Sequence, residues 1–244
     1  MGPLTFDIST ARNKRVLSIP SIEAHNVLAR TSTRDFAAPQ EFLEHIDIGP
    51  ELVVSADQVH ADGICIVSEK DAGGAQKRSC DALITNSPNV ALIIRTADCI
   101  PLFILEPAKR IIGLVHIGWR GAVKWIAAKV IGKMCSNFAI SASECIIAVG
   151  PSIKKDCYEV DKAVVLPLER EFRDHWKYLT KRDDDHWLFD LEKLCIDQMV
   201  EAGAKESNIR RSIHCTHCEG DLFFSYRREG ERAKRLFSVM LMRE

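Results

Sequence analysis

Short apolar runs recur along the chain, and most of them end at a turn residue or a polar side chain. Runs of this kind, bounded by turn residues, are typical of buried strands. The expected strands cover residues 16–19, 26–30, 52–59, 64–67, 81–85, 90–94, 102–105, 111–116, 145–149, 209–213, 222–226 and 236–242. Residues 1–14 and 70–77 lack the pattern, and we interpret both as irregular segments.

Apolar positions at helical spacing predict helices between these strands. In the clearest case, residues 122–138, the apolar side chains of Ile126, Val130 and Met134 would share one face. Further helices are expected at residues 39–46, 163–176 and 191–202. Strands and helices alternate without an internal repeat or a long linker. This pattern predicts one layered α/β (α+β) domain of mixed β-sheets flanked by helices, with residues 1–30 supplying its N-terminal strands.

Composition narrows the class of protein. The 244 residues are 46% hydrophobic and 27% charged, which is usual for a globular protein with a large core. A net charge of −1 gives no reason to expect nucleic acid or an anionic membrane as a partner. No run approaches the ~20 apolar residues of a membrane helix, and the N-terminus lacks a secretion signal, so we expect a cytoplasmic protein. Nine cysteines are scattered through apolar elements, and we expect most to be reduced core residues.

Three residues able to bind a metal follow predicted strands, namely His60, Cys99 and His116. Imidazole and thiolate together suit zinc, and three protein ligands leave a fourth position for water or substrate. The same Cys99 and His116 could instead act without metal, as a nucleophile and its base. Asp98, next to Cys99, is a candidate proton shuttle, although it could equally cap a turn.

Other motifs are weaker. Residues 214–218 read His-Cys-Thr-His-Cys, but no second Cys/His pair lies at zinc-finger spacing, so we interpret the thiols as incidental. Arg34 follows Thr-Ser-Thr, a combination suited to phosphate. Arg120 beside the helix start at Gly121 forms a second possible anion site. Residues 223–228 mix aromatic rings with paired arginines and could stack a planar ring or form an amphipathic strand.

Several motifs in fixed order resemble the YfiH/laccase-domain family, whose members are described as polyphenol oxidases, purine nucleoside phosphorylases or peptidoglycan-editing proteins. The resemblance covers residues 31–244. The motifs are Gln58-Val59-His60, Asp81-Ala82-Leu83-Ile84-Thr85-Asn86, Thr96-Ala97-Asp98-Cys99-Ile100-Pro101, His116-Ile117-Gly118-Trp119-Arg120-Gly121, Gly150-Pro151-Ser152-Ile153 and Phe224-Ser225-Tyr226-Arg227-Arg228.

The resemblance implies a fold similar to the catalytic domain of cytotoxic necrotizing toxins, and a zinc-type site on His60, Cys99 and His116. It implies that Arg34 meets phosphate. The chain differs from the family just after Arg34, where Asp35 and Phe36 replace two glycines. The implied partners are a purine nucleoside and phosphate.

The leading hypothesis is therefore a zinc-dependent purine nucleoside enzyme. It would phosphorolyse adenosine, inosine and methylthioadenosine to free base and ribose 1-phosphate, and would also deaminate adenosine. The alternative is a cysteine hydrolase or amidase that edits peptidoglycan precursors with Cys99 as nucleophile. A copper oxidase is less favoured, because such enzymes need many histidines around several copper ions and the eight histidines here are scattered. A non-enzymatic partner protein is the least favoured alternative.

Overall fold

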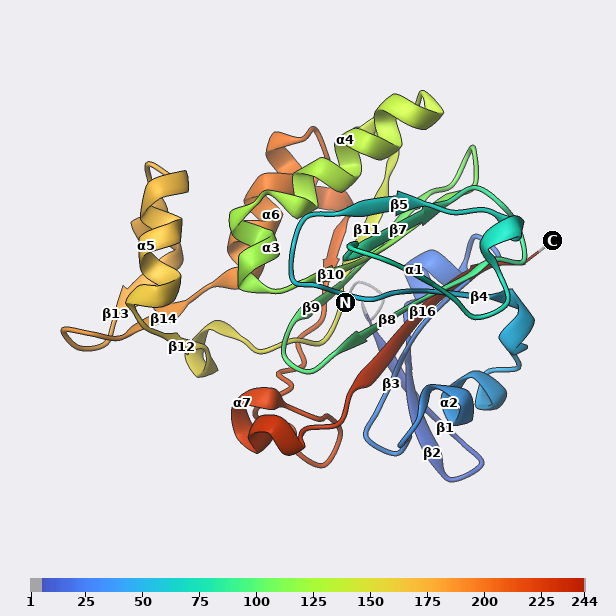
Figure 1. The fold of residues 1–244 in the computed structure, drawn as a ribbon, viewed down its shortest axis with the longest axis horizontal. Coiled ribbons are helices and arrows are strands. Elements are labelled where there is room, and N and C mark those ends of the chain that lie inside the picture. The colour runs from blue at the N-terminus through green and yellow to red at the C-terminus, as the bar shows by residue number, and fades with distance from the viewer. Residues whose placement is uncertain (1–5, 244) are drawn as a thin grey trace.

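Two large β-sheets form the centre of the molecule in this computed structural model, which describes residues 6–243 (Figure 1). The seven-stranded sheet has the strand order β1 (Asp7–Ala11), β2 (Lys14–Ser18), β3 (Val27–Ser32), β16 (Leu236–Met242), β8 (Ala91–Thr96), β4 (Val53–Ala56) and β6 (Ala75–Lys77). The six-stranded sheet has the order β15 (Ile209–Arg211), β11 (Ile146–Val149), β9 (Ile100–Glu106), β10 (Ile111–Ile117), β7 (Ala82–Thr85) and β5 (Ile64–Ile66). Both sheets mix parallel and antiparallel pairs.

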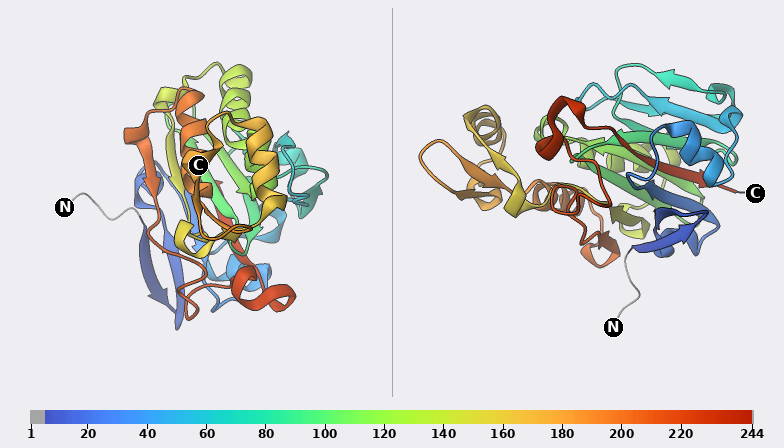
Figure 2. Two further views of the ribbon diagram at one scale, coloured as in Figure 1. Left: turned by 90° about the vertical axis from the view of Figure 1, so that its left-hand side faces the viewer. Right: turned by 90° about the horizontal axis from the view of Figure 1, so that it is seen from below.

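Helices cover the outer faces of the sheets (Figures 1 and 2). Helices α3 (Trp119–Val123), α4 (Ile126–Phe138) and α6 (Leu191–Glu201) lie over the six-stranded sheet, and α2 (Pro39–His45) lies beside the seven-stranded one. The short helices α1 (Pro20–Glu23) and α7 (Tyr226–Glu229) belong to connections. At one end, α5 (Lys162–Glu171) packs with a small third sheet of order β12 (Glu159–Val160), β14 (Trp187–Phe189), β13 (Leu179–Lys181). None of the helices in residues 6–243 is long and apolar enough to span a membrane.

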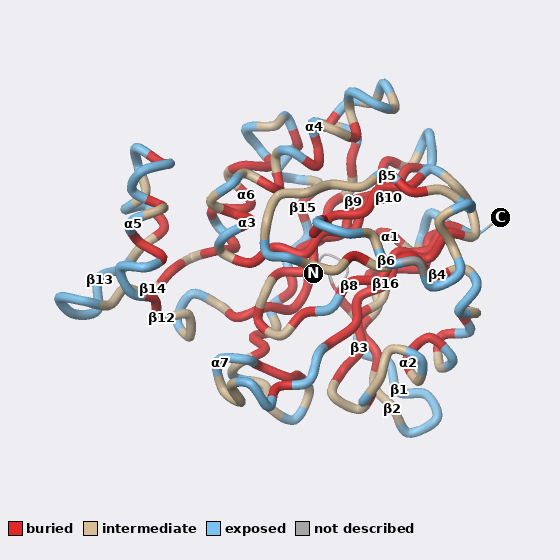
Figure 3. Tube along the Cα trace, in the orientation of Figure 1, coloured by how far each residue is buried: buried red, intermediate tan, exposed pale blue. Residues whose placement is uncertain are grey.

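Strand β9 shows how the core is layered. All seven of its residues are buried, because both faces of its sheet are covered, and this explains the continuous apolar run in the sequence. Side chains alternate along the strand: Leu102 and Ile104 join the cluster under the helices, whereas Phe103 and Leu105 join the cluster between the sheets. Figure 3 shows the resulting band of buried chain through the centre of the molecule.

The structure corrects the expected helix at residues 122–138. The chain breaks at Trp125, which has a left-handed φ of 64°, so that α3 and α4 are separate helices. The Trp125 ring packs on Phe172, and its indole nitrogen donates a hydrogen bond to Glu171. The expected helix at residues 163–176 ends at Glu171. The backbone is extended at Phe172, and the ring of Phe172 packs on Trp125.

Strand predictions failed where local hydrogen bonds or tertiary pairing decided the outcome. Residues 222–226 are not a strand, because the Ser225 hydroxyl accepts a hydrogen bond from the Arg228 amide and caps α7. Strand β4 ends at Ala56 instead of continuing to Val59. Part of each segment expected to be irregular is a strand, β1 through its pairing with β2 and β6 through its pairing with β4.

Phe103→Ala tests the layered core. The ring is fully buried between the sheets, so its removal should lower the free energy of unfolding by about 3–5 kcal/mol. Urea titration followed by circular dichroism measures the change. Ile213→Ala is the matched control, because this side chain is 87% exposed, and it should change stability by less than about 0.5 kcal/mol. A small effect of Phe103→Ala would contradict the layered core.

Candidate active site

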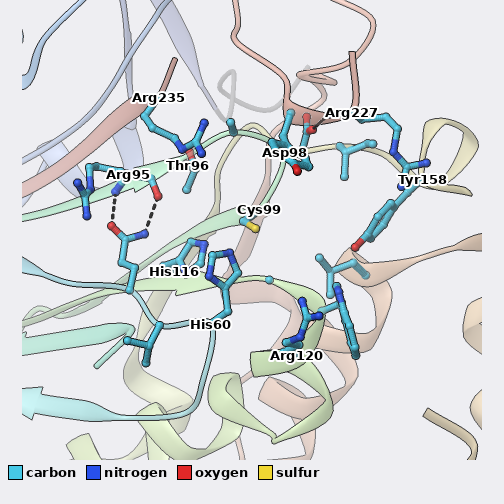
Figure 4. Close-up of a pocket in the computed structure, with 18 of the residues that line it drawn as sticks. His60, Arg95, Thr96, Asp98, Cys99, His116, Arg120, Tyr158, Arg227 and Arg235 are labelled. Carbon is cyan, nitrogen blue, oxygen red and sulfur yellow. Dashed lines mark hydrogen bonds between the residues drawn. The ribbon is translucent and has the colours of Figure 1, made fainter. Parts of the chain in front are cut away.

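A cavity of about 950 Å³ lies where strands of both sheets end. Figure 4 shows side chains from separate segments of the chain pointing into it. His60 comes from the loop after β4, Cys99 from the turn between β8 and β9, and His116 from the end of β10. The structure therefore brings together the three metal-binding candidates of the sequence, which are up to 56 positions apart (116 − 60 = 56).

The three side chains are close enough to share one metal ion. One ligand atom of each lies within 4.8 Å of the others, and the rings of His60 and His116 are 4.7 Å apart at an angle of 85°. Gly118 leaves the space that this cluster needs, since a Cβ there would lie 3.1 Å from both the Cys99 sulfur and Cδ2 of His60. The motif His-Ile-Gly-Trp-Arg-Gly thus supplies the candidate ligand His116, and its Gly118 leaves room for Cys99 and His60.

Asp81 fixes the orientation of both histidines. Its buried carboxylate lies 2.7 Å from Nδ1 of His116 and accepts hydrogen bonds from the backbone amides of His60 and Ala61. The bond at Nδ1 leaves Nε2 of His116 for Cys99 or a metal. The amide bonds hold the backbone at His60, where φ is 57°. The sequence analysis did not single out Asp81, although it opens one of the family motifs.

Cys99 and His116 shift each other's proton affinity. Burial opposes ionisation of the Cys99 thiol, but the charge and hydrogen bond of His116, together with a hydrogen bond from His60, lower its pKa to about 6. Burial likewise opposes protonation of His116, yet Cys99 and Asp81 raise its pKa to about 9. Without metal the pair is therefore a thiolate and an imidazolium near neutral pH.

The donor set fits a catalytic metal ion. One thiolate and two imidazoles are zinc-type ligands, the lowered pKa of Cys99 favours the ligating form, and Asp81 orients His116 as a carboxylate does behind zinc-bound histidines. All three residues line the cavity, so a position beside the metal would face a bound substrate. The two other candidates from the sequence, Asp98 and Arg34, lie in different surroundings.

Asp98 lines the cavity, but its carboxylate is occupied. It accepts hydrogen bonds from the hydroxyls of Thr216 and Ser225 and from the backbone amide of Arg227, at 2.7–3.0 Å. Asp98 has a φ of 86°, which marks a constrained turn. These contacts support the positional role that the sequence left open, because they tie the segment of Arg227 to the turn of Cys99.

Arg34 is absent from the described residues that line the cavity. Its guanidinium donates to the carbonyl oxygen of Gly220 and lies over the ring of Phe224. Next to it, Asp35 pairs with Arg15, and the Phe36 ring is fully buried. The two residues that follow Arg34 are thus held by Arg15 and by the core.

Four other arginines line the cavity, namely Arg95, Arg120, Arg227 and Arg235. The carboxylates among the lining residues are those of Asp57 and Asp98, so the lining favours an anion. Sequence reasoning raised Arg120 and the motif of Arg227, but it missed Arg95, whose neighbours carry no anion-binding pattern.

The chain is similar in sequence to a known family and to proteins that act on purine nucleosides. The family model described as multi-copper polyphenol oxidoreductase laccase matches residues 36–243. Purine nucleoside phosphorylase YlmD of Bacillus subtilis (strain 168) is 31% identical over 202 residues, which cover 78% of this chain and 71% of that protein. Adenosine deaminase RL5, from an unknown prokaryotic organism, is 31% identical over 193 residues, which cover 76% of this chain and 73% of that protein.

A solved structure is similar over the whole chain. The crystal structure of YlmD from Geobacillus stearothermophilus matches with a TM-score of 0.90 and 25% identity, covering 99% of this chain and 100% of that one. The fold class predicted from the sequence is therefore confirmed.

Alkylation of metal-free protein tests whether Cys99 and His116 form a thiolate–imidazolium pair. Because the pKa of Cys99 is lowered to about 6, its reaction with iodoacetamide should stay fast at neutral pH and fall only as the pH drops through about 6. Peptide mass mapping across a pH series measures the midpoint. His116→Ala should move that midpoint up towards the ordinary value of 9.0. Cys135, whose pKa is raised by burial, serves as the internal control and should react only at high pH. A midpoint for Cys99 equal to that of Cys135 would refute the pairing.

Proposed function

The chain belongs to the family described as multi-copper polyphenol oxidoreductase laccase, and from this membership we propose that it is a zinc-dependent purine nucleoside enzyme. It splits adenosine, inosine and methylthioadenosine with phosphate into free base and ribose 1-phosphate, and it deaminates adenosine. The names of a purine nucleoside phosphorylase and an adenosine deaminase among the relatives support this proposal. The observation that carries it is a triad of metal ligands opening onto an arginine-lined cavity.

Zinc suits the triad better than copper does. Two histidines and a cysteine also form blue-copper sites, but those are completed by a weak axial ligand, usually methionine, and transfer electrons. No methionine lies among the described lining residues of the cavity, and the triad faces a space large enough for a substrate. When bound, zinc supplies a Lewis acid that polarises a purine or a water molecule.

The cavity walls suit a nucleoside and an anion. Trp119, Tyr158 and Tyr226 offer aromatic faces on which a purine can stack. Arg120 lies over the Trp119 ring and Arg227 over the Tyr158 ring, so cations flank the stacking surface. We assign phosphate to these pocket arginines, because Arg34 is held by Gly220 outside the lining.

Two reactions share this arrangement. In phosphorolysis a phosphate oxygen bonds to the anomeric carbon of the ribose, the bond to the purine nitrogen breaks, and the proton that the phosphate loses ends on the departing base. In deamination the oxygen of water bonds to C6 of adenosine, and ammonia leaves. The arginines hold phosphate in place for the first reaction, and Asp98 fixes the backbone of Arg227 instead of carrying a proton.

A second activity is supported by the thiolate and imidazolium of the metal-free site. This pair is the arrangement of a cysteine hydrolase or amidase, with Cys99 as nucleophile and His116 as the base that has taken its proton, and its substrate class would be peptidoglycan precursors. Chelators separate the two functions, because hydrolase activity would survive metal removal whereas the nucleoside activities would not.

The primary test is chromatography of products from purified protein incubated with adenosine, with and without phosphate. Adenine should form only with phosphate, and inosine should form in both samples. Cys99→Ala should lose the metal ion of this site and at least about 99% of both activities, because one ligand in three is gone. Cys135→Ser, which lies outside the triad, is the matched control and should be fully active. Full activity and metal in Cys99→Ala would refute the assignment.

Arg120→Gln tests the phosphate site. Loss of a charge-assisted contact should raise the KM for phosphate about tenfold or more, with little change in the deamination rate. Arg34→Gln is the comparison, and it should change that KM less, because Arg34 lies outside the cavity lining. Steady-state kinetics at varied phosphate concentration measures both. The reverse order of effects would return the phosphate role to Arg34.

A further inference from the structure

A second group of metal-binding side chains lies outside the candidate active site. Cys157 follows β11 on a short turn, and its sulfur is 3.1 Å from that of Cys218, which is 61 positions later in the chain. A ring nitrogen of His217 and these two sulfur atoms all lie within 4.8 Å of one another. None of the three residues lines the 950 Å³ cavity, so this group is distinct from the triad of His60, Cys99 and His116.

A third thiol completes the set. The thiol of Cys215 lies beside this group and interacts with the thiols of both Cys157 and Cys218. Cys215 is buried, with 7% of its surface exposed, and its backbone forms a β-bridge with Ser152. The donor atoms of Cys157, His217 and Cys218 are therefore close enough to share one metal ion, and Cys215 offers a third thiol next to them. The sequence did not reveal this, because the ligand that completes the Cys-x-x-Cys pair comes from a remote turn.

We propose that Cys157, Cys215, His217 and Cys218 bind a structural zinc ion. Three thiolates and one imidazole are a complete tetrahedral ligand set, and soft sulfur donors select zinc over magnesium or calcium. The active-site triad supplies three ligands and opens onto a cavity. The second group supplies four and leaves no position for a substrate.

Metal binding explains this grouping better than a disulfide does. A disulfide between Cys157 and Cys218 would use two of the sulfur atoms and leave Cys215 and His217 without a role. His214, the other histidine of the motif, is left out of the set because His217, and not His214, has a ring nitrogen within 4.8 Å of the sulfur atoms of Cys157 and Cys218. The ligands are thus selected by geometry and not by proximity in sequence.

The proposed zinc would connect two segments of the cavity rim. Cys157 directly precedes Tyr158, which lines the cavity. On the other side, Thr216 donates its hydroxyl hydrogen bond to Asp98, and Arg228 donates to the carbonyl oxygens of Thr216 and His217. A metal at this point would hold the Tyr158 turn against the segment that leads to Tyr226 and Arg227.

Metal counting on the full chain tests the proposal. Protein purified with zinc under reducing conditions is measured by mass spectrometry of its metal content, and wild type should hold about two zinc ions per chain. Cys218→Ser should lose about one of them, as should Cys157→Ser, while Cys135→Ser should keep both. Cys218 is exposed, so its replacement should leave the circular dichroism spectrum unchanged.

Cobalt(II) gives an optical readout of the same site that does not depend on counting metal ions. Cys99→Ser protein loaded with cobalt should show the intense thiolate-to-cobalt charge-transfer band of a sulfur-rich tetrahedral site, because only the second group then supplies thiolates. Adding Cys218→Ser should weaken the band strongly. Loss of zinc in Cys218→Ser but not in Cys99→Ser would leave this proposal standing and refute the catalytic zinc.

Two outcomes would overturn the second site. One is an unchanged zinc content in both Cys157→Ser and Cys218→Ser. The other is an intact mass two hydrogens lower than the reduced chain, with Cys157 and Cys218 linked in a tryptic peptide, which would make the pair a disulfide.

Discussion

The hydrogen bond between the buried carboxylate of Asp81 and the ring of His116 is the interaction on which the candidate active site depends. The same carboxylate accepts the amides of His60 and Ala61, and the backbone oxygen of Asp81 accepts the amide of His116. Asp81, directly before β7, thus positions the His116 ring on the neighbouring strand β10 and also the loop that carries His60. A buried carboxylate is costly unless it is fully hydrogen-bonded, and these contacts meet that requirement.

The layered core makes this arrangement rigid. Strand β9 is packed on both faces, and β10 beside it carries the candidate ligand His116 next to its last residue, so the strand ends that carry the site have little freedom. The cavity rim has the opposite character, because turns and short helices carry Tyr158, Arg120 and Arg227. The hydrogen bonds that Thr216, Ser225 and Arg227 donate to Asp98, together with the proposed second zinc, would limit the motion of that rim. Catalytic ligands on strands and substrate contacts on loops are a common division in enzymes.

The sequence predicted the elements whose signals are local. Continuous apolar runs identified β9 and β10, and the candidate ligands His60, Cys99 and His116 were singled out because each comes after or at the end of a predicted strand. Periodicity could not reveal the break at Trp125, since that break is stabilised by Phe172 and Glu171 from another helix. Arg34 is held by Gly220 and Phe224, which lie far from it in the chain. The second cysteine group likewise needs Cys157, which is 61 positions from Cys218. Pairings over such distances are set by the tertiary fold, which one sequence does not specify by spacing.

The central claim is that Asp81 holds His60, Cys99 and His116 as ligands of one catalytic metal ion. X-ray diffraction at the zinc absorption edge, from crystals of protein that is active on adenosine, tests it most directly. We expect an anomalous peak between the Cys99 sulfur and the two imidazole rings. In Asp81→Ala crystals both this peak and the activity should be lost. An active crystal without a peak at this position would contradict the claim.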